Sequence, residues 1–300
     1  MRVAISGASG LIGSALAADL TAAGAEVRPL VRRPARTPQE IQWDPLAPGG
    51  SLDPAALAGL DAVVHLSGAP VAPSRWTARR KAVLRVSRIA STRAVVAAMT
   101  AADPAPGVLI CGSAIGFYGD TGDRSVDETG PAGSGFLAEL VQDWEAATWP
   151  AAEAGIRVVN IRSGVVLAMG GGMLGSLLLP FKLGLGARIG SGQQYLSWIS
   201  LADEIAAIRF LLEHAELSGP VNLTAPQPVP NAEFTKALAS AVRRPGRLRL
   251  PSPLVKGALG EVAVELLGSA RVVPARLTAA GFTFADPAIG PALTSIVATG

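Results

Sequence analysis

Cysteine, histidine and tyrosine are all scarce in this chain of 300 residues, which has one cysteine, two histidines and two tyrosines. A single cysteine, Cys111, excludes an internal disulfide framework and a metal site built from several thiolates. We therefore expect neither disulfide staples nor a metal centre, and any stability must come from a hydrophobic core. Hydrophobic residues make up 49% of the chain, enough for a core of that kind.

A strong excess of charge of one sign is also absent. The 26 basic and 23 acidic residues leave a net charge of +3. The densest basic cluster is RWTARRKAVLRVSR at residues 75–88. Nucleic-acid recognition would favour an aromatic or glycine-rich segment beside such a cluster, and none is present there. We interpret the cluster as the solvated face of a helix and expect no nucleic-acid partner.

Long apolar segments of the kind that enter membranes are missing as well. The first residues do not show the charged and then apolar segments of a signal peptide. The longest uncharged stretch, residues 163–181, has 19 residues, but five are glycine and Pro180 lies near its end. A strand followed by a glycine-rich loop explains it better than a membrane span. We expect a cytoplasmic protein without a membrane partner.

What the chain does have is an alternation of short apolar runs with helical stretches. Apolar runs at 2–6, 26–31, 61–66, 108–111 and 156–161 alternate with helical spacing at 11–23, 75–101 and 136–154. This order predicts an α/β fold with a Rossmann-type doubly wound parallel sheet. After about residue 200 helices dominate. We expect an NADP-binding domain at 1–222 and a small, mostly helical, substrate-side part at 223–300.

The stretch RVAISGASGLIGSAL carries glycines at positions 7, 10 and 13, between a predicted strand and a predicted helix. Glycine lets the backbone approach a ligand closely, and the N-terminus of the following helix attracts a pyrophosphate. Strand, glycine triplet, helix and second strand occupy about 30 residues, the context in which this motif binds dinucleotides. We therefore predict a dinucleotide site at Gly7, Gly10 and Gly13, with a turn needed only for packing as the alternative.

The second strand indicates which dinucleotide is bound. It runs EVRPLVRRP, and Arg32 and Arg33 stand where an NAD site usually has an acidic residue. Arginine offers fixed, paired donors to a phosphate. We predict that Arg32 and Arg33 bind the 2′-phosphate of NADP(H). The alternative is two surface arginines at the end of a strand.

With GASGLIG, DAVVHLSG and GSAIGFYG in this order, the chain resembles the extended short-chain dehydrogenase/reductase superfamily, the NAD(P)-dependent epimerase/dehydratase-like proteins. The segments VVNIRSGVVL and WISLADEIAAI resemble the sixth strand and a later helix start of that superfamily. The stretch from LRLPSP to GFTF is similar to the helical C-terminal extension of one branch. Proteins of that branch are called epimerase-like and sometimes cell-division-inhibitor-like.

The resemblance implies cofactor contacts at individual positions. The matching positions are Gly7, Ser9, Gly10, Leu11 and Ile12 in the pyrophosphate turn, Leu66, Ser67, Gly68 and Ala69 in the loop along the adenosine and pyrophosphate, and Ser163, Gly164 and Val165 beside the nicotinamide. Asp44 could match the acid near the adenine or could simply be a turn residue before Pro45. Arg88 stands where the superfamily often has Asn, and we count it with the cofactor contacts.

The resemblance also implies a catalytic serine, Ser113, but one familiar pair is missing. In the superfamily a Tyr transfers the proton and a Lys four residues later lowers its pKa. Here the matching helix begins SGFLAELVQDWE, so Phe136 or a neighbour stands at the Tyr position and Leu140 or Glu139 at the Lys position. Neither tyrosine has a lysine four residues later, and no lysine occurs between positions 81 and 182.

If hydride chemistry occurs, another proton donor must serve. Tyr118 is the first candidate, with Arg88 supplying the positive charge that Lys normally brings, and the alternative is that Tyr118 only packs under the cofactor. The leading hypothesis is an NADP(H)-dependent oxidoreductase or epimerase acting on an unknown small molecule. The alternative is a non-catalytic NADP(H)-binding regulatory or scaffold protein. Either could be a monomer or a homodimer.

Overall fold

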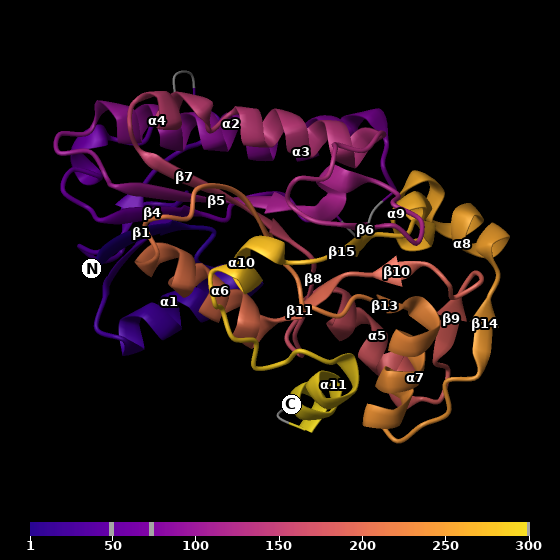
Figure 1. The fold of residues 1–300 in the computed structure, drawn as a ribbon. Helices are drawn as coiled ribbons and strands as arrows, with labels where there is room; N and C mark the ends of the chain where they lie inside the picture. Colours follow the sequence, from indigo (N-terminus) through magenta and orange to yellow (C-terminus); the bar gives the residue numbers. More distant parts are fainter. Residues whose placement is uncertain (48–50, 72–74, 299–300) are drawn as a thin grey trace.

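The computed structural model describes residues 1–47, 51–71 and 75–298, and its centre is a parallel sheet of seven strands (Figure 1). In spatial order these are β12 (Gly219–Leu223), β7 (Arg157–Ser163), β5 (Val108–Ala114), β4 (Ala62–His65), β1 (Arg2–Ser6), β2 (Glu26–Val31) and β3 (Ile41–Gln42). The order reverses between β1 and β4, so the predicted Rossmann-type doubly wound sheet is confirmed.

The central strands are apolar because the sheet is covered on both faces. All four residues of β4 are buried, and the first six residues of β5 are buried as well. A parallel strand with helices on both sides needs such a continuous apolar run. Within β5 and β7, Ser113 pairs with Arg162 and Ala114 with Ser163. This register places both strand ends at the same carboxyl edge of the sheet.

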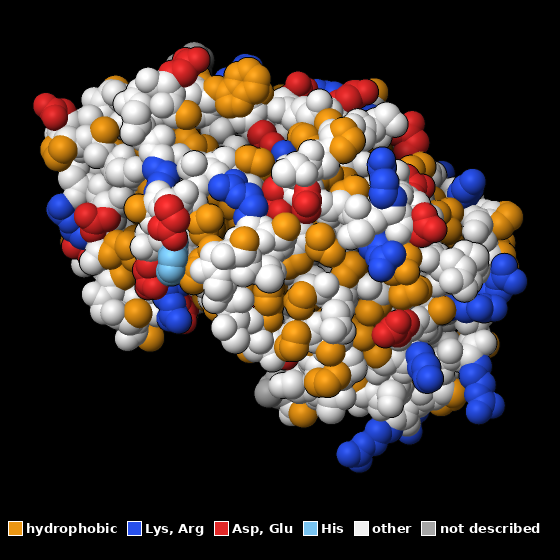
Figure 2. Space-filling model, viewed as in Figure 1, with side chains coloured by type: hydrophobic (Ala, Val, Ile, Leu, Met, Phe, Trp, Pro, Cys, Tyr) orange, Lys and Arg blue, Asp and Glu red, His pale blue; other side chains and the backbone are white. Residues whose placement is uncertain are grey.

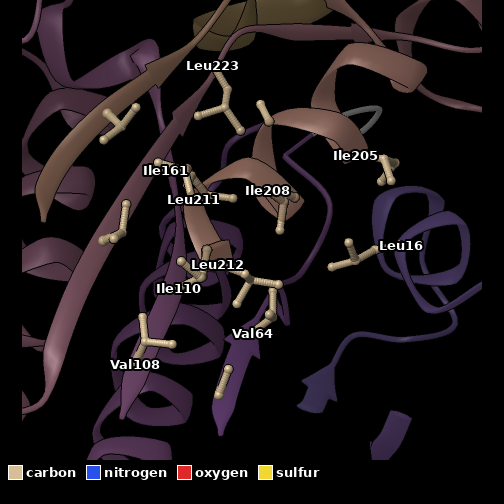
Figure 3. Packing of buried hydrophobic residues seen from close by; sticks show 14 of the residues in the cluster. Leu16, Val64, Val108, Ile110, Ile161, Ile205, Ile208, Leu211, Leu212 and Leu223 are labelled. Atoms are coloured by element: carbon tan, nitrogen blue, oxygen red, sulfur yellow. The ribbon is translucent and has the colours of Figure 1, made fainter. Parts of the chain in front are cut away.

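Two helical layers enclose the sheet (Figure 1). One contains α1 (Leu11–Ala22) and α6 (Leu201–Glu213), which pack on each other, and the other contains α2 (Ala78–Ala101), α3 (Phe136–Ala146) and α4 (Trp149–Glu153). On the first side, Ile208 and Leu211 of α6 lie against Ile110 and Ile161 of the strands (Figure 3). We refer to these two sides of the sheet as the α6 face and the α3 face.

The remaining elements form a second lobe beside the carboxyl edge. They are β8 (Val165–Leu167), α5 (Gly172–Lys182), β9 (Ala187–Ile189), β10 (Tyr195–Leu196), β11 (Trp198–Ser200), β13 (Val229–Pro230), α7 (Asn231–Ala241), β14 (Leu248–Leu250), α8 (Ser252–Leu259), α9 (Ala263–Leu267), β15 (Arg271–Val272) and α11 (Ile289–Ala298). Helix α10 (Ala275–Ala279) packs instead on β12, with Leu277 in the core of the sheet. One core joins Leu174 and Trp198 to Phe234 and Leu293. Residues between 165 and 200 therefore share a core with residues that follow β12.

Short elements complete the chain: η1 (Pro54–Ala56), η2 (Ile115–Tyr118), β6 (Ser125–Val126), which pairs with β15, and η3 (Gly260–Val262). The C-terminal segment reaches back to the start of α2, where Arg75 Nε donates to the carbonyl oxygen of Ala258 at 3.0 Å. Lys81 and Glu261 form an ion pair in the same region. The C-terminal helices are therefore tied to the beginning of α2.

The surface is mixed in character. Figure 2 shows Lys and Arg side chains gathered at the lower right, over α7 and β14, while acidic side chains are spread over the rest of this face. Among the described residues, no helix has both the length and the apolar character needed to cross a bilayer.

Candidate functional site

The glycine turn after β1 touches the end of β4 through bare backbone. Gly7 has a φ of +72°, and a Cβ there would lie 2.8 Å from the carbonyl oxygen of Leu66. A Cβ on Gly13 would lie 2.2 Å from the carbonyl oxygen of Gly7. Both contacts are too short for any side chain, so these two positions require glycine for the strand, the turn and the helix to meet.

Helix α1 begins next to that turn with its first N–H groups uncapped. Gly10 is the N-cap residue, and no side chain accepts a hydrogen bond there. Ser9 and Gly10 are exposed, and Leu11 and Ile12 are partly exposed. Four N–H groups at a helix start lack intrahelical partners and carry partial positive charge. The turn is therefore an open cradle for an anion, and the residues present fit the pyrophosphate of a dinucleotide.

The loop after β4 is held in place from below. The hydroxyl of Ser6 accepts the N–H groups of Leu66 at 3.1 Å and Ser67 at 3.3 Å. The same hydroxyl lies 2.7 Å from Nδ1 of His65, whose Nε2 lies 3.1 Å from the Ser91 hydroxyl. Burial lowers the pKa of His65 to about 4, so the ring stays neutral near pH 7. His65 therefore supports the loop and does not titrate there.

Arg88 braces the other end of this loop. Its Nη1 donates to the carbonyl oxygen of Ala69 at 3.0 Å, and its guanidinium lies 5.1 Å from the Trp144 ring. A Cβ on Gly68 would lie 3.3 Å from Arg88 Cζ. Burial, with a smaller effect from the charge of Arg80, lowers the pKa of Arg88 to about 10. Arg88 is thus committed to the loop at 68–69.

Of the two arginines that follow β2, one is paired and one is free. Arg33 donates to both carboxylate oxygens of Glu40, at 2.8 and 2.5 Å. Hydrogen bonds from Arg33 and from the Arg36 N–H hold the pKa of Glu40 near 2. Arg32 is exposed and has no hydrogen-bond or ion-pair partner within the described ranges. Arg32 is therefore the guanidinium available to a ligand, while Arg33 shapes the loop that follows.

Asp44 lies after β3 and takes the geometry of a turn residue. Its Oδ1 accepts the N–H of Leu46 at 2.9 Å, and its own N–H donates to the Ser51 hydroxyl. The side chain is exposed. The sequence left two roles open for Asp44, a contact near the adenine and a turn before Pro45. The contacts seen in the structure are those of a turn.

On the α3 face, five polar residues form one buried chain of hydrogen bonds. Ser113 Oγ donates to Oε1 of Glu145 at 2.6 Å, and Glu145 accepts two bonds from Arg162, both at 2.8 Å. Arg162 Nη1 donates to the hydroxyl oxygen of Tyr118 at 2.9 Å, and that hydroxyl donates to Oδ1 of Asn222 at 2.8 Å. This chain joins β5, α3, β7, η2 and β12 at the carboxyl edge.

Within this chain Tyr118 is enclosed. Its side chain is only 3% exposed, and its hydroxyl already both accepts and donates a hydrogen bond. Burial raises the pKa of the Tyr118 phenol, and the nearby Arg162 offsets only part of that rise. The positive charge next to Tyr118 thus belongs to Arg162, not to Arg88 as we expected from the sequence. Nothing in the motif pattern had marked Arg162.

The helix face that meets the end of β5 is aliphatic. A Cβ on Gly116 would lie 3.4 Å from Cβ of Leu137 and 4.0 Å from Cγ2 of Val141. Phe136, Leu137 and Leu140 pack in one cluster with Leu84 of α2. The sequence left the Tyr position to Phe136 or a neighbour, and Leu137 is the neighbour that lies beside Gly116.

On the α6 face, Ser163 at the end of β7 meets a buried acid. Its Oγ lies 2.6 Å from Oε1 of Glu204, which belongs to the first turn of α6. Glu204 is fully buried, and its Oε2 has no hydrogen-bond partner. Burial raises the pKa of Glu204 to about 8. The sequence offered one overlooked signal for this residue, an acid within the apolar spacing of LADEIAAI.

Gly164 and Val165 continue from Ser163 in a tight connection. A Cβ on Gly164 would lie 2.7 Å from the carbonyl oxygen of Ser197, and the Val165 N–H donates to that same oxygen at 2.9 Å. The structure therefore brings the segment 163–165 to the carboxyl edge, in the strand next to Ser113 and two strands away from β4.

The acidic residues of the loop at 120–128 each have partners inside the protein. Asp120 accepts the N–H of Gly122 at 2.9 Å, and Glu128 accepts the N–H of Asn222 at 3.0 Å. Across the part of the chain that the structure describes, no group of three or more His, Cys, Asp or Glu side chains could hold a metal ion.

Nearly the whole chain is similar to known proteins. A family model described as "NAD dependent epimerase/dehydratase family" matches residues 3–223, and one described as "Domain of unknown function (DUF1731)" matches residues 250–296. An epimerase family protein of Mycobacterium bovis is 52% identical over 292 residues, which are 97% of this chain and 96% of that protein. The human epimerase family protein SDR39U1 is 37% identical, over 99% of this chain and 100% of its own length.

The chain is also similar to solved structures of epimerase-like proteins. A crystal structure of human SDR39U1 with NADPH matches with a TM-score of 0.92 at 36% identity and covers 100% of both chains. A nucleoside-diphosphate sugar epimerase from Corynebacterium glutamicum matches with a TM-score of 0.81, also at 36% identity, over 99% of this chain and 58% of that one.

Proposed function

This chain belongs to the NAD dependent epimerase/dehydratase family, and we propose that it is an NADP(H)-dependent oxidoreductase or epimerase acting on a small molecule. The observation that carries the choice of cofactor is Arg32, an exposed guanidinium without a partner among the described residues, directly after β2. A guanidinium at the end of the second strand is the feature that accommodates a 2′-phosphate. The NADPH in the structure of human SDR39U1 supports the same choice.

The rest of the proposed cofactor site follows from the cradle. The uncapped start of α1 would hold the pyrophosphate, and Leu66 to Ala69 would border the adenosine. Ser163, Gly164 and Val165 would lie beside the nicotinamide. The cofactor, when bound, supplies or accepts a hydride, and the protein must supply or accept the accompanying proton.

We propose that Tyr118 is a structural support under the site and that a hydroxyl at the carboxyl edge handles the proton. The enclosed Tyr118 hydroxyl and the aliphatic pair Leu137 and Val141 support this view, since α3, all of whose residues the structure describes, has neither Tyr nor Lys. The same two observations favour the second candidate, an NADP(H)-binding regulatory or scaffold protein. The two candidates differ only in whether bound NADPH is ever oxidised by a substrate.

Calorimetric titration with NADPH and NADH tests the cofactor assignment. A charge-assisted hydrogen bond contributes about 1.5–3 kcal/mol, so Arg32→Ala should weaken NADPH binding by roughly 10- to 100-fold. NADH affinity should stay within about threefold, because NADH has no 2′-phosphate. Arg93→Ala, at an exposed arginine of α2, is the matched control and should change neither affinity. Equal affinities of the wild type for NADPH and NADH would contradict the proposal.

A screen of small carbonyl compounds for NADPH oxidation separates the two candidates. Turnover with a narrow group of compounds supports an enzyme. Tight NADPH binding without turnover of any compound supports the regulatory or scaffold candidate.

A further inference from the structure

Glu204 is the most unusual charged group at the carboxyl edge. It lies in the stripe of α6 that faces the sheet, with Ala207, Ile208 and Leu211, all four fully buried. Among the described residues, its Oε1 has one hydrogen-bond partner, Ser163 Oγ at 2.6 Å, and its Oε2 has no such partner. Burying an ionised carboxylate with a single hydrogen bond is very costly, whereas a neutral acid avoids most of that cost. At neutral pH Glu204 therefore holds a proton, in agreement with its raised pKa of about 8.

When Glu204 is ionised, Ser163 Oγ donates to its Oε1. When Glu204 is protonated this bond can reverse, because a proton on Oε1 can be donated to Ser163 Oγ, whereas a proton on Oε2 finds no acceptor among the described residues. Because a serine hydroxyl is both donor and acceptor, Ser163 then keeps its own proton free for another partner. Glu204 thus turns Ser163 into a hydroxyl that can donate outward.

Ser163 is also the most accessible of the candidate hydroxyls. Ser113 is 7% exposed and donates to Glu145, and Tyr118 is 3% exposed and donates to Asn222. Ser163 is partly exposed at the end of β7, level with Ala114 at the end of β5. Of the three, Ser163 is the most exposed, and its proton is free for another partner when the protonated Glu204 donates to it.

No other charge competes with this pair. Among the described residues packed on α6, β8 and β11 contain no titratable side chain, and Cys111 of β5 points to the α3 face, as does Arg162 of β7. On the helices, Asp19 of α1 pairs with Arg209, while Asp203 accepts the N–H groups of Ala285 and Asp286. Among the described residues, Ser163 is therefore the one hydrogen-bond partner of Glu204.

We propose that Glu204 and Ser163 form a proton relay that serves this site in place of the missing Tyr–Lys pair. The proposal rests on the proposed function, because it needs an NADP(H) cofactor and a substrate oxygen at this edge. As negative charge develops on the substrate oxygen, that oxygen takes the proton of Ser163 Oγ, and Ser163 Oγ takes the proton of Glu204 Oε1. Each oxygen that loses its proton keeps the electron pair of the broken bond. The net result is one protonated substrate oxygen and one Glu204 carboxylate, which regains its proton from solvent.

The relay has a consequence that does not require a substrate. The nicotinamide ring of NADP⁺ carries a positive charge that NADPH lacks, and a nearby positive charge favours the ionised form of Glu204. NADP⁺ binding should therefore release a proton from Glu204, while NADPH binding should not. Both forms carry the same phosphates, so proton changes from the phosphates cancel in the comparison.

Calorimetric titration of both cofactors at pH 7.5, in buffers of different ionisation enthalpy, measures this release directly. We expect NADP⁺ to release more protons than NADPH, and its affinity relative to NADPH to rise about tenfold between pH 6.5 and 9, as a coupling of one pKa unit requires. Glu204→Gln should abolish both differences. Glu213→Gln, at an exposed position of the same helix, is the matched control and should keep them.

Ser163→Ala separates the relay from a structural role. It should keep the proton release, shifted to higher pH because Glu204 loses the hydrogen bond that stabilises its ionised form, but should abolish turnover of any substrate. If neither cofactor binds the wild type, the proposed function fails. If both bind with equal proton release across this pH range, or if Glu204→Gln keeps the difference, the relay is wrong. Should Glu204→Gln not fold, loss of the protonated carboxyl band from the wild-type infrared spectrum on NADP⁺ binding decides the same question.

Discussion

Two buried glutamates lie at the carboxyl edge of the same sheet, on opposite faces, and their surroundings differ completely. Glu145 on the α3 face accepts hydrogen bonds from Ser113 and from two nitrogens of Arg162. Glu204 on the α6 face has only Ser163 beside it and leaves one oxygen without a partner. The opposite placement follows from strand alternation, since Arg162 and Ser163 are neighbours in β7 and point to opposite sides.

These surroundings give Glu145 a structural role and leave Glu204 available for proton transfer. Glu145 is neutralised by Arg162, and both are held in a chain that ends at Asn222. Burial alone would lower the pKa of Arg162, but the hydrogen bonds and charge of Glu145 raise it, so the guanidinium stays charged. Glu204 has no such partner and must carry a proton instead. The α3 face therefore fixes the geometry of the strand ends, and on the α6 face Glu204 holds a proton next to them.

The largest effect should come from breaking the ion pair on the α3 face. Arg162→Met leaves Glu145 without its charged partner and with Ser113 alone, which should lower the free energy of unfolding by about 3–5 kcal/mol. Urea unfolding measures this. The matched control is Arg209→Met, since the partly exposed pair of Arg209 and Asp19 should contribute less than about 1 kcal/mol. If Arg162→Met lowers the free energy of unfolding by no more than Arg209→Met does, the ion pair does not stabilise Glu145, and the contrast between the two glutamates is wrong.

The second effect is a pH dependence that belongs to the α6 face. The native state keeps a proton on Glu204 up to a pKa of about 8, while the unfolded chain releases it above the ordinary 4.5. The native state thus binds more protons in this window, and the stability contributed by Glu204 is lost as pH rises. Glu204→Gln should be more stable than the wild type by roughly 4–5 kcal/mol at pH 9, from about 1.4 kcal/mol for each pKa unit, and similar to it at pH 5.

Urea unfolding of wild type, Glu204→Gln and Glu213→Gln between pH 5 and pH 9 tests this sign. The Glu213→Gln control should follow the wild type throughout. A wild type that grows more stable relative to Glu204→Gln as pH rises would mean that Glu204 is ionised in the native protein.

The smallest effect concerns Tyr118, at the end of the α3-face chain. Tyr118→Phe removes the bonds to Arg162 and Asn222, which should cost about 1–2 kcal/mol of stability. NADPH affinity should stay within about threefold, because the hydroxyl faces the interior. Tyr195→Phe is the control, and thermal unfolding with NADPH titration measures both quantities. A large loss of NADPH affinity in Tyr118→Phe alone would place this hydroxyl in the cofactor site.

The sheet and the cofactor turn could be predicted because local sequence determines them. Apolar runs such as VLIC in β5, the positive φ of Gly7 and the contact of Gly13 with the Gly7 carbonyl oxygen depend on neighbours close in the chain. For Arg33 the sequence predicted a phosphate contact, whereas the structure shows it paired with Glu40, seven residues away. Nothing in the sequence indicated which of Arg32 and Arg33 would pair with Glu40.

The candidate site was harder to predict, because its polar contacts join residues far apart in the chain. Arg162 reaches Tyr118 across 44 positions and Glu204 reaches Ser163 across 41. The sequence left the Tyr position of α3 to Phe136 or a neighbour, because the pattern alone does not say which residue lies beside Gly116; in the structure these are Leu137 and Val141. Residues 165–200 join the C-terminal lobe through a shared core that no local pattern reveals.

The contrast between the two faces is tested most directly by the protonation state of Glu204 itself. In protein labelled with carbon-13 at the glutamate carboxyl carbons, the Glu204 resonance is identified as the one that Glu204→Gln removes. At pH 7 we predict the position of a protonated acid, with a change to the carboxylate position near pH 8. A Glu204 resonance already at the carboxylate position at pH 6 would contradict both the stored proton and the relay built on it.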